Sequence, residues 1–333
     1  MSTRRSYSNT KISLVPAAPA PKTLSLYPDF LTRSRVSLFQ LRVILRINWV
    51  VSAKFQFCVH LADLPLLEGI QEFFGGIGYI TKDTQNNKVD YVVTKLSDLY
   101  NVIIPHFNKY PLLTQKRLDF ILWSKVVIIM KNGGHLTTEG LREIIGIKAS
   151  INNQLTPALK AAFSYIVPFV RPVLEPSTAV IYDPQWIVGF VTGDGSFSAS
   201  SNNTLRKAFR VRFMVTQHAR DLKLLEVIKN YFGGIGSISK NGGAFNYEVS
   251  SYKDCYNFIL PFFIEHTIPS IAIKSHNFGV WKEILEIMIA GGNKTEAGKL
   301  QINSLLSNLN KYKGVSKGKA SDSHASEDKP LSL

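Results

Sequence analysis

The sequence predicts an α+β fold of two pseudo-symmetric αββαββα domains. Three observations support this prediction: a long internal repeat, strand-like alternation within each copy, and apolar spacing typical of helices between the strands. The stretch LPLLEGIQEFFGGIGYITK at 64–82 recurs as LKLLEVIKNYFGGIGSISK at 222–240, so the offset is 222 − 64 = 158 residues. Only two copies of so long a unit exclude a solenoid and indicate an internal pseudo-dimer.

The elements of each copy follow in a fixed order. In the second copy a helix is expected over 185–194, two alternating strands over 197–217, a helix over 221–232 with Asp221 as its cap, and a second hairpin over 233–252. Further helices extend to Asn310. YNVIIPHF at 100–107 matches YNFILPFF at 256–263 at an offset of 256 − 100 = 156, so the two copies differ by two residues in a hairpin. The pattern predicts antiparallel sheets rather than a wound parallel sheet.

The repeat divides the chain into five predicted segments. They are a disordered or targeting arm (1–26), a first repeat domain (27–153), a linker (154–183), a second repeat domain (184–312) and a disordered tail (313–333). The arm contains Arg4, Arg5 and Lys11 and no acid before Asp29. It is similar to a mitochondrial transit peptide, and a basic arm would have the same composition. A mitochondrial location is therefore expected.

Charge points to a polyanionic partner. The chain carries 39 Lys and Arg against 24 Asp and Glu, a formal net charge of +15, which favours nucleic acid over a membrane surface. Apolar runs such as 126–130 are far shorter than the roughly 18 residues that a membrane helix requires. The two cysteines, Cys58 and Cys255, are expected to be core thiols rather than a disulfide or a metal site.

One face of the predicted hairpins is basic. In TLRKAFRVRFMV the apolar residues alternate with arginines, and the strands of the first copy alternate in the same way. A two-stranded ribbon with Arg and Gln side chains fits the major groove of duplex DNA, where Arg bonds guanine and Gln bonds adenine. A solvated sheet face gives the same alternation, but its presence in both copies favours DNA. The candidate DNA-binding residues are Gln40, Arg42, Arg46, Lys54, Gln56, Arg206 and Arg212.

The stretch WIVGFVTGDGSF at 186–197 predicts a helix crossing with an acid at its end. Gly189 and Gly193 lie on one helical face and allow close approach by a second helix, which in a pseudo-dimer is the equivalent helix of the other half. Each helix would then deliver an acid to one shared place, where paired carboxylates bind a divalent metal beside DNA phosphate. Asp194 also fits an ordinary turn acid, but an acid at a helix C-terminus is electrostatically unfavourable.

These residues resemble the LAGLIDADG homing endonucleases in the single-chain, double-motif form found in fungal mitochondrial introns. The likeness extends from about Tyr27 to Asn310 and includes GGHLTTEGLREII. It implies two antiparallel sheets that form a saddle on double-stranded DNA, a helix pair at the domain seam and a monomeric chain. It also implies Mg²⁺ at Asp194 and hydrolysis of a phosphodiester by metal-activated water. Basic residues would stabilise the developing charge, with Arg210, Lys82 and Lys240 as candidates.

The first copy departs from the pattern. Position 194 − 158 = 36 is Val36, RSRVS replaces the glycines and the acid, and no acid lies between Asp29 and Asp63. One carboxylate alone cannot serve two strands symmetrically, so double-strand cleavage is in question. Three explanations are open: decay to an inactive DNA-binding relic, recruitment as a maturase that binds its host intron RNA, or an error in the sequence across this stretch.

Overall fold

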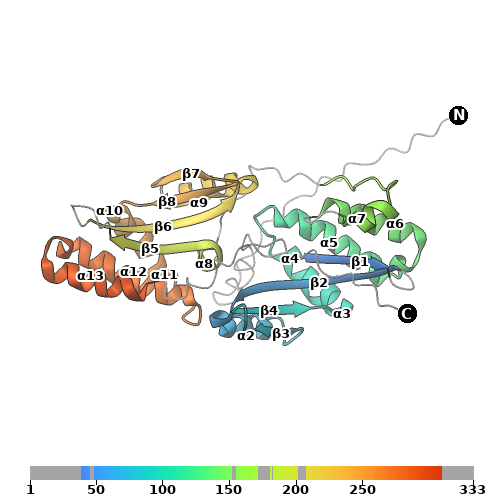
Figure 1. Cartoon of the computed structure of the whole chain (residues 1–333), viewed down its shortest axis with the longest axis horizontal. Coiled ribbons are helices and arrows are strands. Elements are labelled where there is room, and N and C mark those ends of the chain that lie inside the picture. Colours follow the sequence, from blue (N-terminus) through green and yellow to red (C-terminus); the bar gives the residue numbers. More distant parts are fainter. Residues whose placement is uncertain are drawn as a thin grey trace.

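The chain folds into two halves, each built around a four-stranded antiparallel sheet (Figure 1). This computed structural model describes residues 39–45, 49–151, 155–171, 181, 183–201 and 208–309. The strand orders are β1-β2-β4-β3 and β5-β6-β8-β7, so each central strand pairs with both hairpins. The α+β class and the antiparallel sheets predicted from the sequence are confirmed.

The elements of the two halves follow the same order. The first half contains β1 (Phe39–Leu45), β2 (Trp49–His60), η1 (Leu61–Asp63), α2 (Leu64–Phe73), β3 (Tyr79–Asp83), β4 (Lys88–Val93), α3 (Leu96–Asp98), η2 (Leu99–Ile103), α4 (Ile104–Lys109), α5 (Lys116–Lys131), η3 (Gly134–Leu136) and α6 (Thr138–Ser150), followed by α7 (Pro157–Ala162). The second half contains α8 (Pro184–Asp194), β5 (Gly195–Ser201), β6 (Phe209–His218), η5 (Ala219–Asp221), α9 (Leu222–Tyr231), β7 (Ser237–Asn241), β8 (Ala244–Val249), α10 (Tyr252–Asp254), η6 (Cys255–Ile259), α11 (Leu260–Glu265), α12 (Ile273–Ile289), η7 (Gly292–Lys294) and α13 (Glu296–Asn308).

The strand register reproduces the repeat offset of the sequence. Phe39 pairs with Phe55 in the first sheet, and Phe197 pairs with Phe213 in the second, both 158 residues later. The conformation of the glycine turn is also repeated: Gly236, like its counterpart, has a positive φ, and a Cβ there would lie 2.5 Å or less from backbone oxygen of the neighbouring strand. The duplication is therefore structural as well as sequential.

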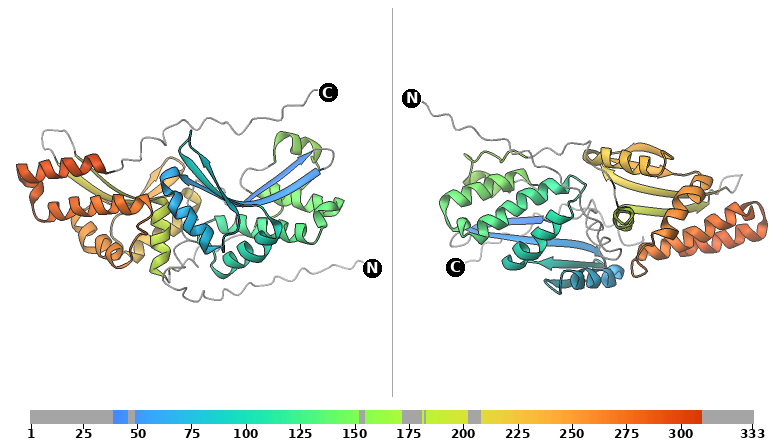
Figure 2. Two further views of the ribbon diagram at one scale, coloured as in Figure 1. Left: turned by 90° about the horizontal axis from the view of Figure 1, so that it is seen from below. Right: turned by 180° about the vertical axis from the view of Figure 1, so that it is seen from behind.

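Alternating side chains give each sheet a core face and a polar face. Phe55, Phe57 and Val59 of β2 are buried, while the residues between them are partly exposed. Helices pack on the core faces, and Figure 2 (left view) shows most of them below the two sheets. The prediction of two core thiols is half wrong. Cys255 is buried, but Cys58 is only partly buried because it belongs to the polar row of β2.

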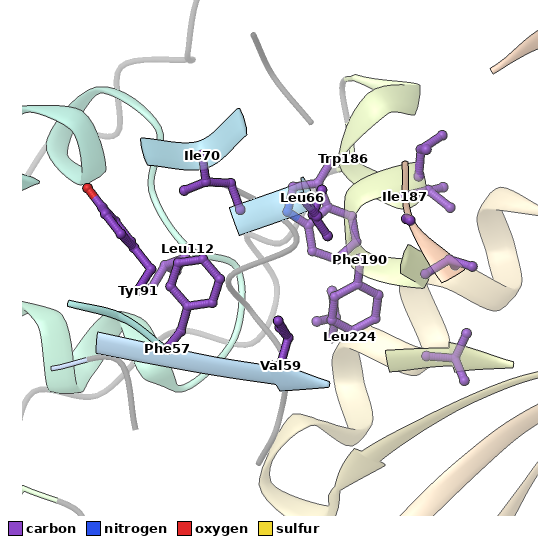
Figure 3. Close-up of a cluster of buried hydrophobic side chains, with 14 of the residues drawn as sticks. Phe57, Val59, Leu66, Ile70, Tyr91, Leu112, Trp186, Ile187, Phe190 and Leu224 are labelled. Carbon is purple, nitrogen blue, oxygen red and sulfur yellow. The ribbon is translucent and has the colours of Figure 1, made fainter. Parts of the chain in front are cut away.

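Apolar side chains join the two halves at a common seam. The cluster in Figure 3 combines Val59 and Leu66 of the first half with Trp186 and Phe190 of the second. Trp186 and Phe190 stack with ring centroids 4.7 Å apart on one side of α8. Helix α8 is thus buried along most of its length. Its predicted crossing partner lies within residues 1–38, outside the described residues.

The predicted linker has regular structure in part. Helix α7 is capped by Thr156, and the ring of Phe163 lies 4.9 Å from that of Trp49. Farther on, the guanidinium of Arg171 donates a hydrogen bond of 2.7 Å to Asp119 of α5. This stretch therefore packs on the first half before the chain passes to the second.

Candidate nucleic-acid interface and acidic site

The polar face of the first sheet carries four of the predicted DNA-binding residues. Gln40 pairs with Lys54 and Arg42 with Ser52, so their side chains share the face opposite the core. Gln56 follows on the same face and donates a hydrogen bond of 2.9 Å to Asp90 of β4. Partial burial lowers the pKa of Lys54, while nearby Asp90 raises it and nearby Arg42 lowers it. The predicted Arg46 lies outside the described residues.

The polar face of the second sheet is rich in hydroxyl and amide groups. Its residues are Ser196, Ser198, Ser200, Arg210, Arg212, Thr216, Asn246, Glu248, Ser237 and Ser239. Thr216 donates to Asn246 at 2.9 Å, and the Arg212 guanidinium lies 3.9 Å from Glu248. Such donors and acceptors suit base edges and phosphates, which are read by these groups in duplex DNA. The predicted Arg206 lies outside the described residues.

Asp194 ends α8 at the point where the chain enters β5. The helix begins after Asp183, whose side chain accepts from the amide of Gln185, and it ends because Gly195 turns into an extended conformation. The amide of Gln217 donates a hydrogen bond of 2.5 Å to the Asp194 carboxylate. Gln217 is only 1% exposed. A buried amide therefore fixes the orientation of a half-buried acid.

A lysine of the first half completes this site. Lys116, the first residue of α5, is 6% exposed. Burial lowers its pKa to about 8, although the Asp194 carboxylate opposes this shift more strongly than any other charge, ahead of Asp221 and Asp119; Arg220 adds to the lowering. Asp194 and Lys116 belong to different halves, so the site exists only because the halves are joined.

Two reciprocal hydrogen bonds hold the lysine-bearing helices. Asp221 accepts from the backbone N–H of Gln115 at 2.8 Å, and Asp63 accepts from the backbone N–H of Ile273 at 2.9 Å. Each carboxylate belongs to one half, each amide to the start of a helix in the other, and both residues of each pair are 158 apart. Asp221 was predicted to cap its own helix, but its side chain makes no cap hydrogen bond there.

We expect Asp221→Ala to lower the free energy of unfolding by about 1–2 kcal/mol, because a helix-start N–H in the seam loses its acceptor. Asp221→Asn should cost less, since the amide oxygen can still accept and no charge is buried. Thermal unfolding of the two variants and the wild type measures the difference. Equal stability of all three proteins would contradict the role of the carboxylate in joining the halves.

The structure does not place the other predicted catalytic residues beside Asp194. Arg210 pairs with Ser200, five residues along β5 from Gly195 and thus about 17 Å away along the strand. Lys240 pairs with Phe245, which pairs with Gln217, so two strand spacings of about 10 Å in total separate Lys240 from Gln217. Lys82 occupies the matching outer strand of the first half.

Sequence reasoning missed the groups that the fold brings to the acid. Lys116 and Lys274 are 158 apart, and so are Asp63 and Asp221. Lys274 donates a hydrogen bond to the carbonyl oxygen of Gly195, next to Asp194. A search of the repeat for polar residues kept at this offset would have found both pairs. Gln217 gave no such signal because its position in the first copy is not glutamine.

The donor set fits a divalent cation only with help from a ligand. Among the described residues there is no group of three or more His, Cys, Asp and Glu side chains suited to a metal. Mg²⁺ is typically held by one or two carboxylates together with substrate phosphates and waters. The oriented carboxylate of Asp194 matches this coordination once a phosphate lies beside it. No helix in the described part of the chain has the length and apolarity needed to cross a membrane.

The fold and the site define a class of protein: a single chain whose duplicated halves present two polar sheet faces, with an acidic site at their seam. The chain belongs to the LAGLIDADG endonuclease family, whose model matches residues 37–127 and again residues 187–285. The resemblance stated from the motifs is thereby confirmed.

Solved structures and curated relatives agree with this assignment. The I-SmaMI LAGLIDADG homing endonuclease bound to cleaved DNA is 34% identical, with a TM-score of 0.80 over 89% of this chain and 99% of that chain. I-SmaMI bound to uncleaved DNA with calcium ions is 35% identical, also with a TM-score of 0.80 over 88% and 99% of the two chains. "Probable intron-encoded endonuclease 3" of Neurospora crassa is 38% identical over 78% of this chain. The chain spans 49% and 59% of the length of the two first curated relatives it matches, about half.

Proposed function

We propose that the protein is a homing-type endonuclease that binds a long duplex DNA target and hydrolyses a phosphodiester in a metal-dependent reaction. One observation carries this proposal: Asp194, Gln217 and Lys116 meet at the seam between two polar sheet faces. A duplex lying across both faces would bring its backbone to this seam. The DNA-bound state of I-SmaMI supports the same placement.

Each residue of the site has a chemical task in this reaction. Asp194 would hold the cation, which supplies Lewis-acid stabilisation of the phosphate and lowers the pKa of a bound water. Gln217 keeps the carboxylate oriented and is a candidate to position the attacking water. The ammonium of Lys116 can stabilise the negative charge that develops on the phosphate oxygens. The polar sheet faces bind and align the duplex on both sides.

The finer features of this proposal follow the family. Mg²⁺ is proposed as the working cation because Asp194 supplies oxygen ligands to a site completed by phosphate. The two halves provide both sheets, so a monomer is proposed as the active unit. A mitochondrial location is proposed from the basic, acid-poor arm and from the family. Intron RNA is left as an outcome of the test, since the deep major groove of A-form RNA is poorly accessible to sheet side chains.

The proposal is tested by selection followed by cleavage. Duplexes bound by the full chain in Ca²⁺ are selected from a randomised pool, and the selected sequence is cloned into a supercoiled plasmid. Incubation with Mg²⁺ should break strands in this plasmid but not in the parent vector, and EDTA should abolish the reaction. A bound plasmid that stays supercoiled would overturn the enzymatic proposal, and preferential binding of folded intron RNA would replace DNA as the partner.

A further inference from the structure

We propose that this chain is a strand-specific nicking enzyme, in which Asp194 serves the only reactive site and the pseudo-symmetric site is inert. The inference rests on the proposed endonuclease function and specifies its product. A pseudo-dimer with two equivalent sites cuts both strands of a duplex. The two halves of this chain are equivalent in fold, but the groups at the seam are not equivalent in chemistry.

The counterpart of Gln217 is fixed by the end of its strand. Strand β6 ends at His218, whose Nδ1 accepts from the backbone N–H of Arg220 at 3.2 Å. Strand β2 ends at His60, whose Nδ1 accepts from the backbone N–H of Ala62, also at 3.2 Å. The residue before each histidine therefore occupies the same place in the two sheets.

That residue is Gln217 in the second half and Val59 in the first. Val59 is 3% exposed and forms part of the apolar seam shown in Figure 3. Valine has no polar atom in its side chain, so it can neither orient a carboxylate nor hold a water. A cation and a water held at this place would have only apolar side-chain surface from Val59, which is unfavourable for a charged group.

The acid is also missing from the first copy. Asp194 stands three residues before Phe197, and Phe197 pairs with Phe213 as Phe39 pairs with Phe55. Three residues before Phe39 the sequence has Val36, and the whole stretch from 30 to 62 contains no acid. Residues 1–38 lie outside the described residues, so this step uses the sequence alone.

The supporting elements of the first site are kept. Lys274 begins α12 as Lys116 begins α5, and Asp63 bonds the start of α12 as Asp221 bonds the start of α5. Lys274 donates to the Gly195 carbonyl, within the second half itself. The losses therefore affect the acid and the glutamine but spare the seam, so duplex binding and the reaction at Asp194 are both preserved.

The reaction at Asp194 is one hydrolysis per duplex. Water adds through its oxygen to phosphorus and gives up one proton to solvent, and one bond from phosphorus to a ribose oxygen breaks. That ribose oxygen leaves as a hydroxyl after taking up a proton, and the phosphate stays on the neighbouring nucleotide. No oxidation or reduction takes place, and the opposite strand keeps its backbone.

The test uses the selected duplex with each strand labelled separately. With Mg²⁺, the wild-type chain should cut one strand and leave the other intact, and the plasmid should accumulate as relaxed circles without linear product. Gln217→Val, which gives the second half the residue of the first, should strongly reduce cleavage of that one strand without exposing cleavage of the other. Val59→Thr, which keeps the side-chain volume, should cut like the wild type. Thermal unfolding confirms that both variants fold.

The outcomes separate this inference from the function on which it rests. Cleavage of both strands by the wild type, or cleavage of the opposite strand by Gln217→Val, would overturn nicking and leave the endonuclease proposal standing. A wild-type chain that binds the duplex and cuts neither strand would overturn both. Cleavage of a single strand that depends on Gln217 supports the inference.

Discussion

Asp194→Asn is expected to reduce strand cleavage by about 1,000-fold or more while leaving duplex binding nearly unchanged. Asparagine is the same size as aspartate and can still accept from Gln217, but it lacks the charge that holds a cation beside phosphate. The loss of a factor of 1,000 corresponds to about 4 kcal/mol of activation free energy. Single-turnover cleavage of the labelled duplex in Mg²⁺ and binding in Ca²⁺ measure the two effects separately.

The matched control is Glu265→Gln, which removes an acid whose side chain is 77% exposed and lies on the edge of α11. This variant should cleave like the wild type. If Asp194→Asn retained cleavage within a factor of ten, the carboxylate would not be the ligand of the working cation, and the acidic site would lose its role.

Lys116→Met is expected to stabilise the protein and to disable it. Methionine keeps much of the stem of lysine but removes a charge that is 6% exposed. Because burial lowers the pKa of Lys116 from 10.5 to about 8, the folded state pays for a charge that the unfolded state carries in water. Removing it should raise the free energy of unfolding by about 1–3 kcal/mol at neutral pH. Cleavage should fall by about 100-fold, as after loss of one charge-stabilising donor.

The stability gain of Lys116→Met has a defined pH dependence. Below pH 8 both states of the wild type hold the lysine proton, so the full penalty is present. Between pH 8 and 10.5 the unfolded state binds more protons than the folded state, so wild-type stability rises and the gain of the variant shrinks. Denaturant unfolding in EDTA at pH 7, 9 and 10.5 measures this trend. A gain that is constant across this range would contradict burial of the charge.

Most of the fold could be predicted from the sequence because its signals are local. The alternation in β2 and β6 and the repeat at 158 residues defined both sheets and their core faces. Cys58 was misplaced because an apolar neighbourhood was given more weight than the period of the strand. The hairpin difference was visible as the offset of 156 before any coordinates were known.

The site was predicted only where it lies on one element. Asp194 stands within a recognisable motif, whereas Lys116 reaches it from the other half through the start of α5. Such a contact depends on how the halves pack, which no local pattern reports. Arg210 and Lys240 were chosen as basic residues near the motif, but the strand register places them along and across the sheet. Gln217 was noted only as the end of a strand.

The longer hairpin of the first half has a consequence for the DNA sequence that the chain reads. Four residues, 84–87, separate β3 from β4, whereas Gly242 and Gly243 alone separate β7 from β8. Two additional residues lengthen each arm of a hairpin by one, about 3.3 Å, which is close to the rise of one base pair. Asn86, anchored to Asp83 at 2.8 Å, stiffens this tip. The recognition sequence should therefore be non-palindromic and extend one step farther on the side of the first half.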